Sequence, residues 1–177
     1  MAPRRPPGFT LTELAAVLAI AGLAGVLALP AMGEALARYR LRVAADDLLD
    51  ALNLARATAL WRNRRVSVCP ATDEMTCSPE ADWITGWIVR DLEKTKIVAA
   101  TPRLGQKLRV LRTPGRQEVT FTGRGAASAT NQRIVLCVAA RPATSLAVVV
   151  GNAGLVHRDP VRPHEAAACA AAPARQR

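Results

Sequence analysis

The feature that most constrains this chain is a long apolar run near its N-terminus, from Phe9 to Leu29. Arg4 and Arg5 precede the run, and Glu13 is its one charged residue. At about 1.5 Å per residue, a helix of this length spans roughly 31 Å, about one hydrocarbon thickness of a bilayer. The run therefore predicts a membrane-spanning helix, and the two arginines favour a cytoplasmic position for the short N-terminus.

The charge of Glu13 is costly in such a helix. An acidic side chain inside a span costs about 2.5–3.5 kcal/mol on insertion scales, and it normally has a partner. A secretory signal has its small-residue cleavage site after the apolar core, whereas here the small residue, Gly8, stands before it. Cleavage after Gly8 would give Phe9 a positive amine one helical turn from Glu13, in the same or a neighbouring copy. A glutamate that snorkels to the interface is the alternative.

The segment from Gly8 to Leu14, GFTLTEL, resembles the cleavage signal of type IV prepilins and type II secretion pseudopilins. The resemblance implies that a prepilin peptidase cuts between Gly8 and Phe9, and that Phe9 is N-methylated. It also implies that Glu13 pairs with the N-terminus of a neighbouring subunit during filament assembly. Pro30 matches a proline that many pilins carry at this distance from the cleavage site.

These observations predict the organisation of the chain. Residues 1–8 are expected to be a prepilin leader, 9–30 a transmembrane helix, and 31–63 its continuation into a head. The 177-residue chain leaves enough length beyond the membrane for one small domain, and its few aromatic residues predict a core of Val, Leu and Ile. The resemblance places the protein in the bacterial inner membrane, single-pass, with its head in the periplasm and filament-associated after assembly.

Beyond Pro30, where a kink is expected because proline lacks the backbone donor, the helix is predicted to be amphipathic. Apolar residues recur there at spacings of three and four, and this stripe can pack on a sheet. Its members are Leu41, Ala45, Leu48, Leu52, Ala55 and Ala59.

After Asn63 the pattern changes to a period of two, which predicts strands. The predicted strands cover 65–69, 83–90, 96–100, 108–111, 118–122, 133–138 and 146–150, with an edge strand at 155–157. The fold class is therefore α+β, a pilin-like arrangement in which a long N-terminal helix packs on an antiparallel β-sheet head. This head is expected over 64–158, followed over 159–177 by an irregular tail that a cysteine anchors.

All four cysteines follow the predicted membrane helix, in an oxidising compartment, so disulfides are expected. Of the three possible pairings we favour Cys69–Cys77, which closes a short loop of turn-forming residues, and Cys137–Cys169, which pins the tail to the sheet. A zinc site is the alternative, but neither C-x-x-C nor C-x-x-H spacing exists. No metal or other cofactor is expected.

The head resembles the GspH/FimT family of pilin-like proteins, up to about residue 158. The resemblance depends on the order of several segments, which are 48–70, the tryptophans on either side of Gly86, 120–125, 135–137 and 148–154. It implies a minor subunit of a type IV pilus or a type II secretion pseudopilus, with a role in filament formation and protein secretion. The implied partners are other pilin or pseudopilin subunits, the prepilin peptidase and the inner membrane.

Basic residues offer an alternative function, a pilus-displayed DNA-binding minor pilin acting in DNA uptake with double-stranded DNA as its partner. Cations on one face contact phosphates without sequence preference. The set is Arg103, Lys107, Arg109, Arg112, Arg116, Arg124, Arg133, Arg158 and Arg162. Subunit contact and plain solubility are the other interpretations of this charge. FimT-like proteins commonly carry Gly-Arg-x-Arg near the C-terminus, and here Leu155 follows Gly154 in place of the first arginine.

The sequence contains no recognisable catalytic constellation, so an enzyme is not expected. His157 and His164 lack metal-ligand spacing and are expected at the surface. The segment from Gly123 to Gly125 lacks the lysine and helix of a phosphate-binding loop, and it predicts a hairpin turn instead.

Overall fold

The computed structural model describes residues 10–71, 73, 75–78, 82–94, 96–101, 104 and 107–172, without the side chains of 24–31. The chain divides into two compact units, Met1–Leu36 and Ala37–Arg177, and each is described by itself. The predicted cleavage site, Gly8 and Phe9, lies outside the described residues.

Helix α1 covers Leu11–Arg62 and contributes to both units. In the first unit its described side chains are exposed, among them Leu14 and Ile20. No helix in the described part of the chain is long and apolar enough to cross a membrane. Of the predicted span 9–30, Phe9 and the side chains of 24–30 lie outside that part. Pro30 lies within α1, and the kink expected there stays a prediction.

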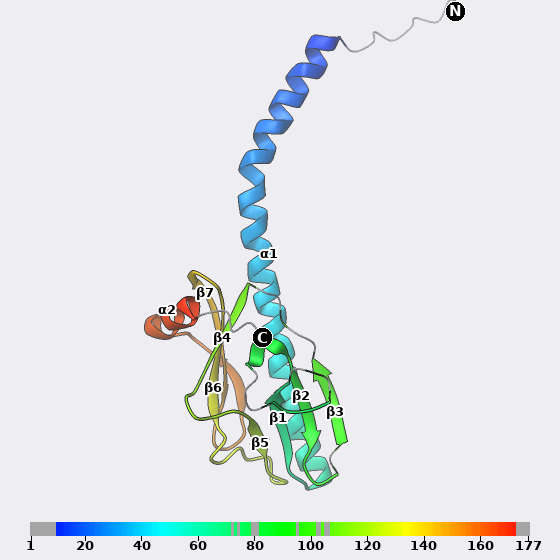
Figure 1. The fold of residues 1–177 in the computed structure, drawn as a ribbon, viewed down its shortest axis with the longest axis vertical. Helices are drawn as coiled ribbons and strands as arrows, with labels where there is room; N and C mark the ends of the chain where they lie inside the picture. Colours follow the sequence, from blue (N-terminus) through cyan, green and yellow to red (C-terminus); the bar gives the residue numbers. More distant parts are fainter. Residues whose placement is uncertain are drawn as a thin grey trace, which may run out of the picture. The chain divides into compact units, whose positions relative to one another are not determined.

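The second unit contains the head, which has two four-stranded sheets where the sequence predicts one (Figure 1). All strand pairs are antiparallel. The first sheet has the order β3-β2-β1-β5, with β1 (Val66–Pro70), β2 (Trp87–Asp91), β3 (Lys96–Thr101) and β5 (Val119–Phe121). The second has the order β4-β6-β7-β8, with β4 (Leu108–Arg112), β6 (Gln132–Val138), β7 (Arg141–Val150) and β8 (Val156–Asp159). Two sheets form because β4 pairs with β6 and with no strand of the first sheet.

Six of the eight predicted strands agree with the structure to within two residues at each end, and two differ by more. The predicted strand 83–90 begins instead with a 3-10 helix, η1 (Trp83–Thr85), and β2 starts only at Trp87. Gly86 between them has a φ of +106°, a backbone conformation outside the strand region that glycine adopts readily. In the second sheet β7 starts at Arg141, earlier than predicted. Its first half was not predicted because it is exposed or half-buried and lacks a continuous apolar run.

The prediction of an irregular tail is wrong for residues 163–171. Residues Pro163–Ala171 form helix α2. Proline suits the first turn of a helix, and alanine has the best helix propensity. At the N-terminus of α2 the Glu165 carboxylate accepts a hydrogen bond from the Arg162 N–H at 3.1 Å, which completes a cap.

The main core lies between the head portion of α1 and the two sheets. All six members of the predicted stripe are buried, namely Leu41, Ala45, Leu48, Leu52, Ala55 and Ala59. Trp83 and Trp87 are also buried, with ring centroids 6.3 Å apart. Every buried residue that the structure describes in this core lies from Leu41 to Val150, within the second unit.

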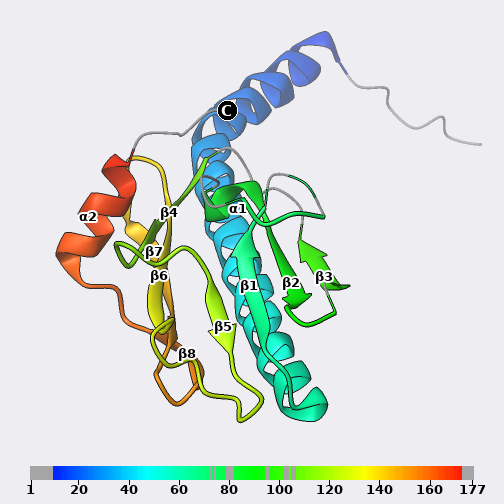
Figure 2. The ribbon, with the colours of Figure 1, turned by 60° about the horizontal axis from the view of Figure 1, so that its bottom comes forward.

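A smaller core lies on the opposite face of the second sheet. There α2 covers β6 and β7, and Cys169 packs with Val135, Cys137 and Ala147. Figure 2 shows this sheet between α2 and α1. The alternation of β6 explains both cores, since Ile134 and Leu136 belong to the main core while Val135 and Cys137 belong to the smaller one.

Candidate functional site

The candidate assembly site is the start of α1. The Thr10 hydroxyl and backbone N–H each donate a hydrogen bond to the Glu13 carboxylate at 2.9 Å. The Glu13 N–H in turn donates to the Thr10 hydroxyl at 3.3 Å. These reciprocal bonds form a capping box, in which Glu13 also complements the positive end of the helix dipole. Glu13 is exposed, so its carboxylate can also accept bonds from another molecule.

The four cysteines form two disulfides, Cys69–Cys77 and Cys137–Cys169, which is the pairing favoured from the sequence. Their Cα atoms are 5.7 and 6.2 Å apart, within the usual range for a disulfide. The first bridge ties the loop after β1 to that strand, and the second ties α2 to β6.

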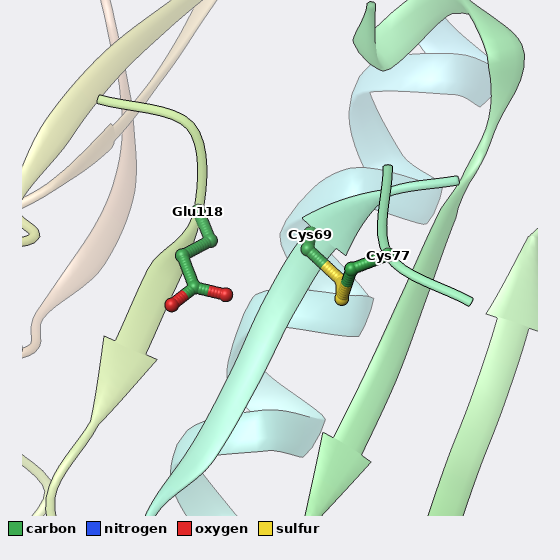
Figure 3. Close-up of side chains that lie close together, drawn as sticks. All are labelled: Cys69, Cys77 and Glu118. Atoms are coloured by element: carbon green, nitrogen blue, oxygen red, sulfur yellow. A yellow bond between two sulfur atoms is a disulfide. The ribbon is translucent and has the colours of Figure 1, made fainter. Parts of the chain in front are cut away.

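Glu118 lies close to the first disulfide, and Figure 3 shows its carboxylate beside the two sulfur atoms. The carboxylate oxygen and both sulfurs lie within 4.8 Å of one another. Such a group can resemble a metal centre, but thiolates are the cysteine ligands of metals, and both sulfurs are bonded in the disulfide. The arrangement is therefore a disulfide with a neighbouring acidic residue.

Arg133, a member of the predicted basic set, bonds three groups within the head. Its Nε lies 3.0 Å from the Glu165 carboxylate, and its other nitrogens bond the Asp159 carboxylate and the Pro160 carbonyl oxygen. The Arg133 side chain is only 15% exposed. Burial raises the pKa of Glu165, but the Arg162 N–H and the charge of Arg133 outweigh burial and hold this pKa below its ordinary value. Arg133 thus joins β6 to α2 and to the segment that directly precedes α2.

Other members of the basic set also bond within the head. Arg109 Nε donates to the Ala172 carbonyl oxygen at 3.3 Å, next to the C-terminal end of α2. Arg158 forms an ion pair with Asp46 of α1 and so ties β8 to that helix. Two more bond backbone carbonyls, Arg112 that of Arg116, and Arg116 that of Asn131.

The remaining cations of the set belong to different segments of the chain. Lys107 lies beside the turn between β6 and β7, where the Ala139 N–H donates to its carbonyl oxygen at 2.9 Å. Arg124 lies in the predicted turn between Gly123 and Gly125, which packs on the C-terminal end of α1. Arg162 precedes α2, and Arg103 lies outside the described residues.

The turn that contains Arg124 is held by a close approach of two loops. A Cβ on Gly154 would overlap the carbonyl group of Gly125, 2.9 Å from its carbon atom. Gly154 has a φ of +78° and Gly125 a φ of +75°. Gly154 is therefore needed for packing at the position where the FimT-like motif begins, and Leu155 beside it is 60% exposed.

Sequence reasoning missed a hollow of about 150 Å³ between α1 and the start of β7. Arg38, Leu41 and Arg42 line it from the helix, and residues 143–146 line it from the strand. The first half of β7 was not predicted as a strand, so its position beside these arginines was not expected. The run of basic residues around Tyr39 was the one sequence signal for a site on this part of α1.

The comparisons with known proteins agree on one kind of protein. A family model described as type II transport protein GspH matches residues 44–154, more than half of the chain. Two crystal structures of the type IV minor pilin FimU from Pseudomonas aeruginosa PAO1 are similar in fold. The form in space group P21 has a TM-score of 0.56 and 22% identity, over 70% of this chain and 90% of that chain. The P65 form has a TM-score of 0.53 and 23% identity, over 68% and 93%.

No curated protein matches the sequence. At these identities the similarity to FimU shows the fold. It confirms the predicted pilin-like α+β class, with a long N-terminal helix packed on antiparallel sheets.

Proposed function

Because the chain belongs to the family of type II transport protein GspH, we propose that it is a pilin-like minor subunit of a filament. The filament is a type IV pilus or a type II secretion pseudopilus, which the subunit enters after leader cleavage. Its role is structural, in filament formation and protein secretion. The family match and the pilin-like fold support this function.

An exposed glutamate carries the proposal. It is Glu13, in the first turn of a long N-terminal helix and within the segment GFTLTEL. We expect the prepilin peptidase to cut between Gly8 and Phe9, and Phe9 to be N-methylated. The new amine on Phe9 of one subunit would pair with Glu13 of a neighbour. Before assembly, residues 9–30 would anchor the subunit in the inner membrane with its head in the periplasm.

Substitution of Glu13 tests this assembly role. Glu13→Ala and Glu13→Val remove the carboxylate, so we expect both variants to remain in the membrane fraction and to be absent from sheared filaments. Glu34→Ala, which removes a charge farther along α1, is the matched control and should be incorporated normally. Immunoblots of membrane and filament fractions measure both quantities. Normal incorporation of either Glu13 variant would refute the pairing.

The processing steps can be measured separately by mass spectrometry of the purified protein. We expect a mature chain that begins at Phe9 and carries one added methyl group. A Gly8→Val variant should keep its leader, because a branched side chain replaces the small residue at the junction. An unprocessed wild-type chain in a host that has the peptidase would contradict the proposal.

DNA binding is a second function, supported by the net charge of +10 and by the exposure of Lys107 and Arg124. Fewer basic residues support DNA binding than the sequence suggests, because Arg109, Arg133 and Arg158 bond within the head. Duplex binding by the head should weaken steeply with salt, since each neutralised phosphate releases counterions. Binding no tighter than that of a charge-matched control protein at low salt would reject this function.

A further inference from the structure

The hollow beside β7 has the donor groups of an oxyanion site. Arg38 and Arg42 are four residues apart, on one face of α1, and both line the hollow. Thr144 and Ser145 line the opposite side. The Ser145 hydroxyl already donates to the Pro142 carbonyl oxygen at 3.0 Å, so the Thr144 hydroxyl is the side-chain donor on this side. Guanidinium and hydroxyl groups are common partners of phosphate and carboxylate oxygens.

The edge of β7 beside the hollow adds to this donor set. Strand β7 begins at Arg141, but β8 pairs only with the stretch from Ala147 to Val150. Over 143–146, therefore, no described strand pairs with that edge of β7. Backbone N–H groups on such an edge are available to an anion.

The residues that line the hollow include two arginines and no acidic residue. Glu34 and Asp46 lie one helical turn beyond these arginines on either side, and Asp46 is paired with Arg158. Arg40 and Arg42 are exposed, and neither has an ion pair or hydrogen bond with any residue that the structure describes. Lys107 is exposed beside the turn that leads into β7.

The position of these residues along α1 indicates the source of the anion. Arg38 follows Pro30, the end of the predicted membrane span, by eight residues, or about 12 Å of helical rise. Side chains on a helix lean toward its N-terminus, here toward the span. Tyr39 lies among the arginines and is 64% exposed, and tyrosine is enriched at membrane interfaces together with basic residues.

We propose that residues 38–42 and the hollow beside β7 bind the phosphate of an anionic phospholipid such as phosphatidylglycerol. The contact would hold the head at the bilayer surface before the subunit enters a filament. This site rests on the membrane anchoring in the proposed function, but the arginines and the hollow belong to the head alone.

Vesicle binding by the head, Ala37–Arg177, tests the site. Every buried residue described in the main core lies within the head, and the full chain would attach to any vesicle through its predicted anchor. The wild-type head should co-sediment with vesicles of phosphatidylcholine mixed with phosphatidylglycerol, and far less with phosphatidylcholine alone. Each arginine near an anionic surface contributes about fivefold to binding, so Arg40→Ala combined with Arg42→Ala should weaken it about 25-fold.

The matched control is Arg65→Ala combined with Arg124→Ala, which removes two exposed arginines at the other end of the head's portion of α1. We expect this variant to lose less than about twofold, because its charges lie more than a Debye length from the hollow. Equal losses in the two double variants, or equal binding to neutral vesicles, would overturn the proposal in favour of non-specific attraction.

Two further results would assign the site to another anion. Titration with inorganic phosphate that depends on Arg42, together with unchanged vesicle binding in the arginine variant, would identify a site for a free oxyanion. Unchanged vesicle binding with reduced incorporation into filaments would identify a contact with an acidic neighbouring subunit. Because Glu13 lies outside the head, failure of the Glu13 experiment leaves the vesicle result unaffected, and the two proposals fail separately.

Discussion

At the residue scale, Gly154 is a position where the head has no room for a side chain. Its φ of +78° disfavours any side chain, and a Cβ there would also overlap the backbone of Gly125. Gly154→Ala should lower the free energy of unfolding by about 3 kcal/mol, because backbone displacement adds to the cost of a positive φ.

Gly115→Ala is the matched control for this prediction. Gly115 has a φ of +76°, but no atom lies within 4 Å of a Cβ built there. Its replacement should cost only about 1 kcal/mol, the conformational term alone. Urea unfolding of the two heads measures the difference, and equal losses would mean that the approach of Gly154 to Gly125 contributes no stability.

Asp91 is a buried carboxylate at the end of β2. Burial raises its pKa, but hydrogen bonds from the Lys94 and Glu93 N–H groups and from Arg62 outweigh burial and hold the pKa below its ordinary value. Since the folded-state pKa lies below the unfolded one, the carboxylate stabilises the head above about pH 4. This stability is lost as the pH falls through the folded-state pKa.

Asp91→Asn should therefore lower the free energy of unfolding at neutral pH by about 1–3 kcal/mol, because Arg62 loses its charged partner. The same change should flatten the decline in stability between pH 5 and pH 3, roughly the range in which the unfolded carboxylate titrates. Chemical unfolding at several pH values measures both effects. A decline as steep as that of the wild type would assign the acid sensitivity to other carboxylates, such as Glu165.

At the scale of elements, the two disulfides should differ in how much they stabilise the head. Cys137–Cys169 closes a separation of 32 residues and holds α2, whereas Cys69–Cys77 closes a separation of 8. Loop entropy predicts contributions of about 4 and about 2.5 kcal/mol, respectively. Cys137→Ser combined with Cys169→Ser should therefore be less stable than Cys69→Ser combined with Cys77→Ser.

Hydrogen exchange separates local from global effects of these variants. Loss of Cys137–Cys169 should speed exchange of the amides of Pro163–Ala171, since the disulfide joins α2 directly to β6. The serine variant at 69 and 77 should leave exchange in α2 unchanged. Unchanged protection of α2 in the first variant would mean that Arg133 and Glu165 hold the helix without the covalent bond.

Most elements of the head were predictable because their signal is local. The stripe from Leu41 to Ala59 has helical spacing, and β6 has a continuous apolar run, so both were predicted near their observed positions. Helix α2 was missed because the prolines around it suggested a tail, and its apolar face becomes useful only against β6. The division into two sheets depends on which strands pair, and no local pattern contains that information.

The bonds that the basic residues make within the head were not predictable for the same physical reason. The basic set looked like one surface because its members are close in sequence. Arg133 instead pairs with acidic groups that lie 26 and 32 positions later in the chain. Arg158 pairs with Asp46 across the head. Such ion pairs follow from tertiary packing, which sequence spacing does not reveal.

At the scale of the whole molecule, the division into two units predicts that the head folds without the part of α1 that precedes Ala37. Every buried residue that the structure describes in the main core lies from Leu41 to Val150, and the smaller core lies within the same unit. The head Ala37–Arg177 should therefore unfold at the same temperature as the head of the full chain in detergent.

The tryptophans show whether the isolated head and the full chain have the same core packing. Trp83 and Trp87 are buried and tilted 44° to one another, so their near-ultraviolet circular dichroism depends on intact packing. Trp61 is 85% exposed, so it should be quenched by acrylamide in both proteins and serves as the internal control. A lower unfolding temperature together with a weaker dichroism signal in the isolated head would mean that residues before Ala37 stabilise the core. An unchanged signal would leave the part of α1 before Ala37 with anchoring and assembly as its roles.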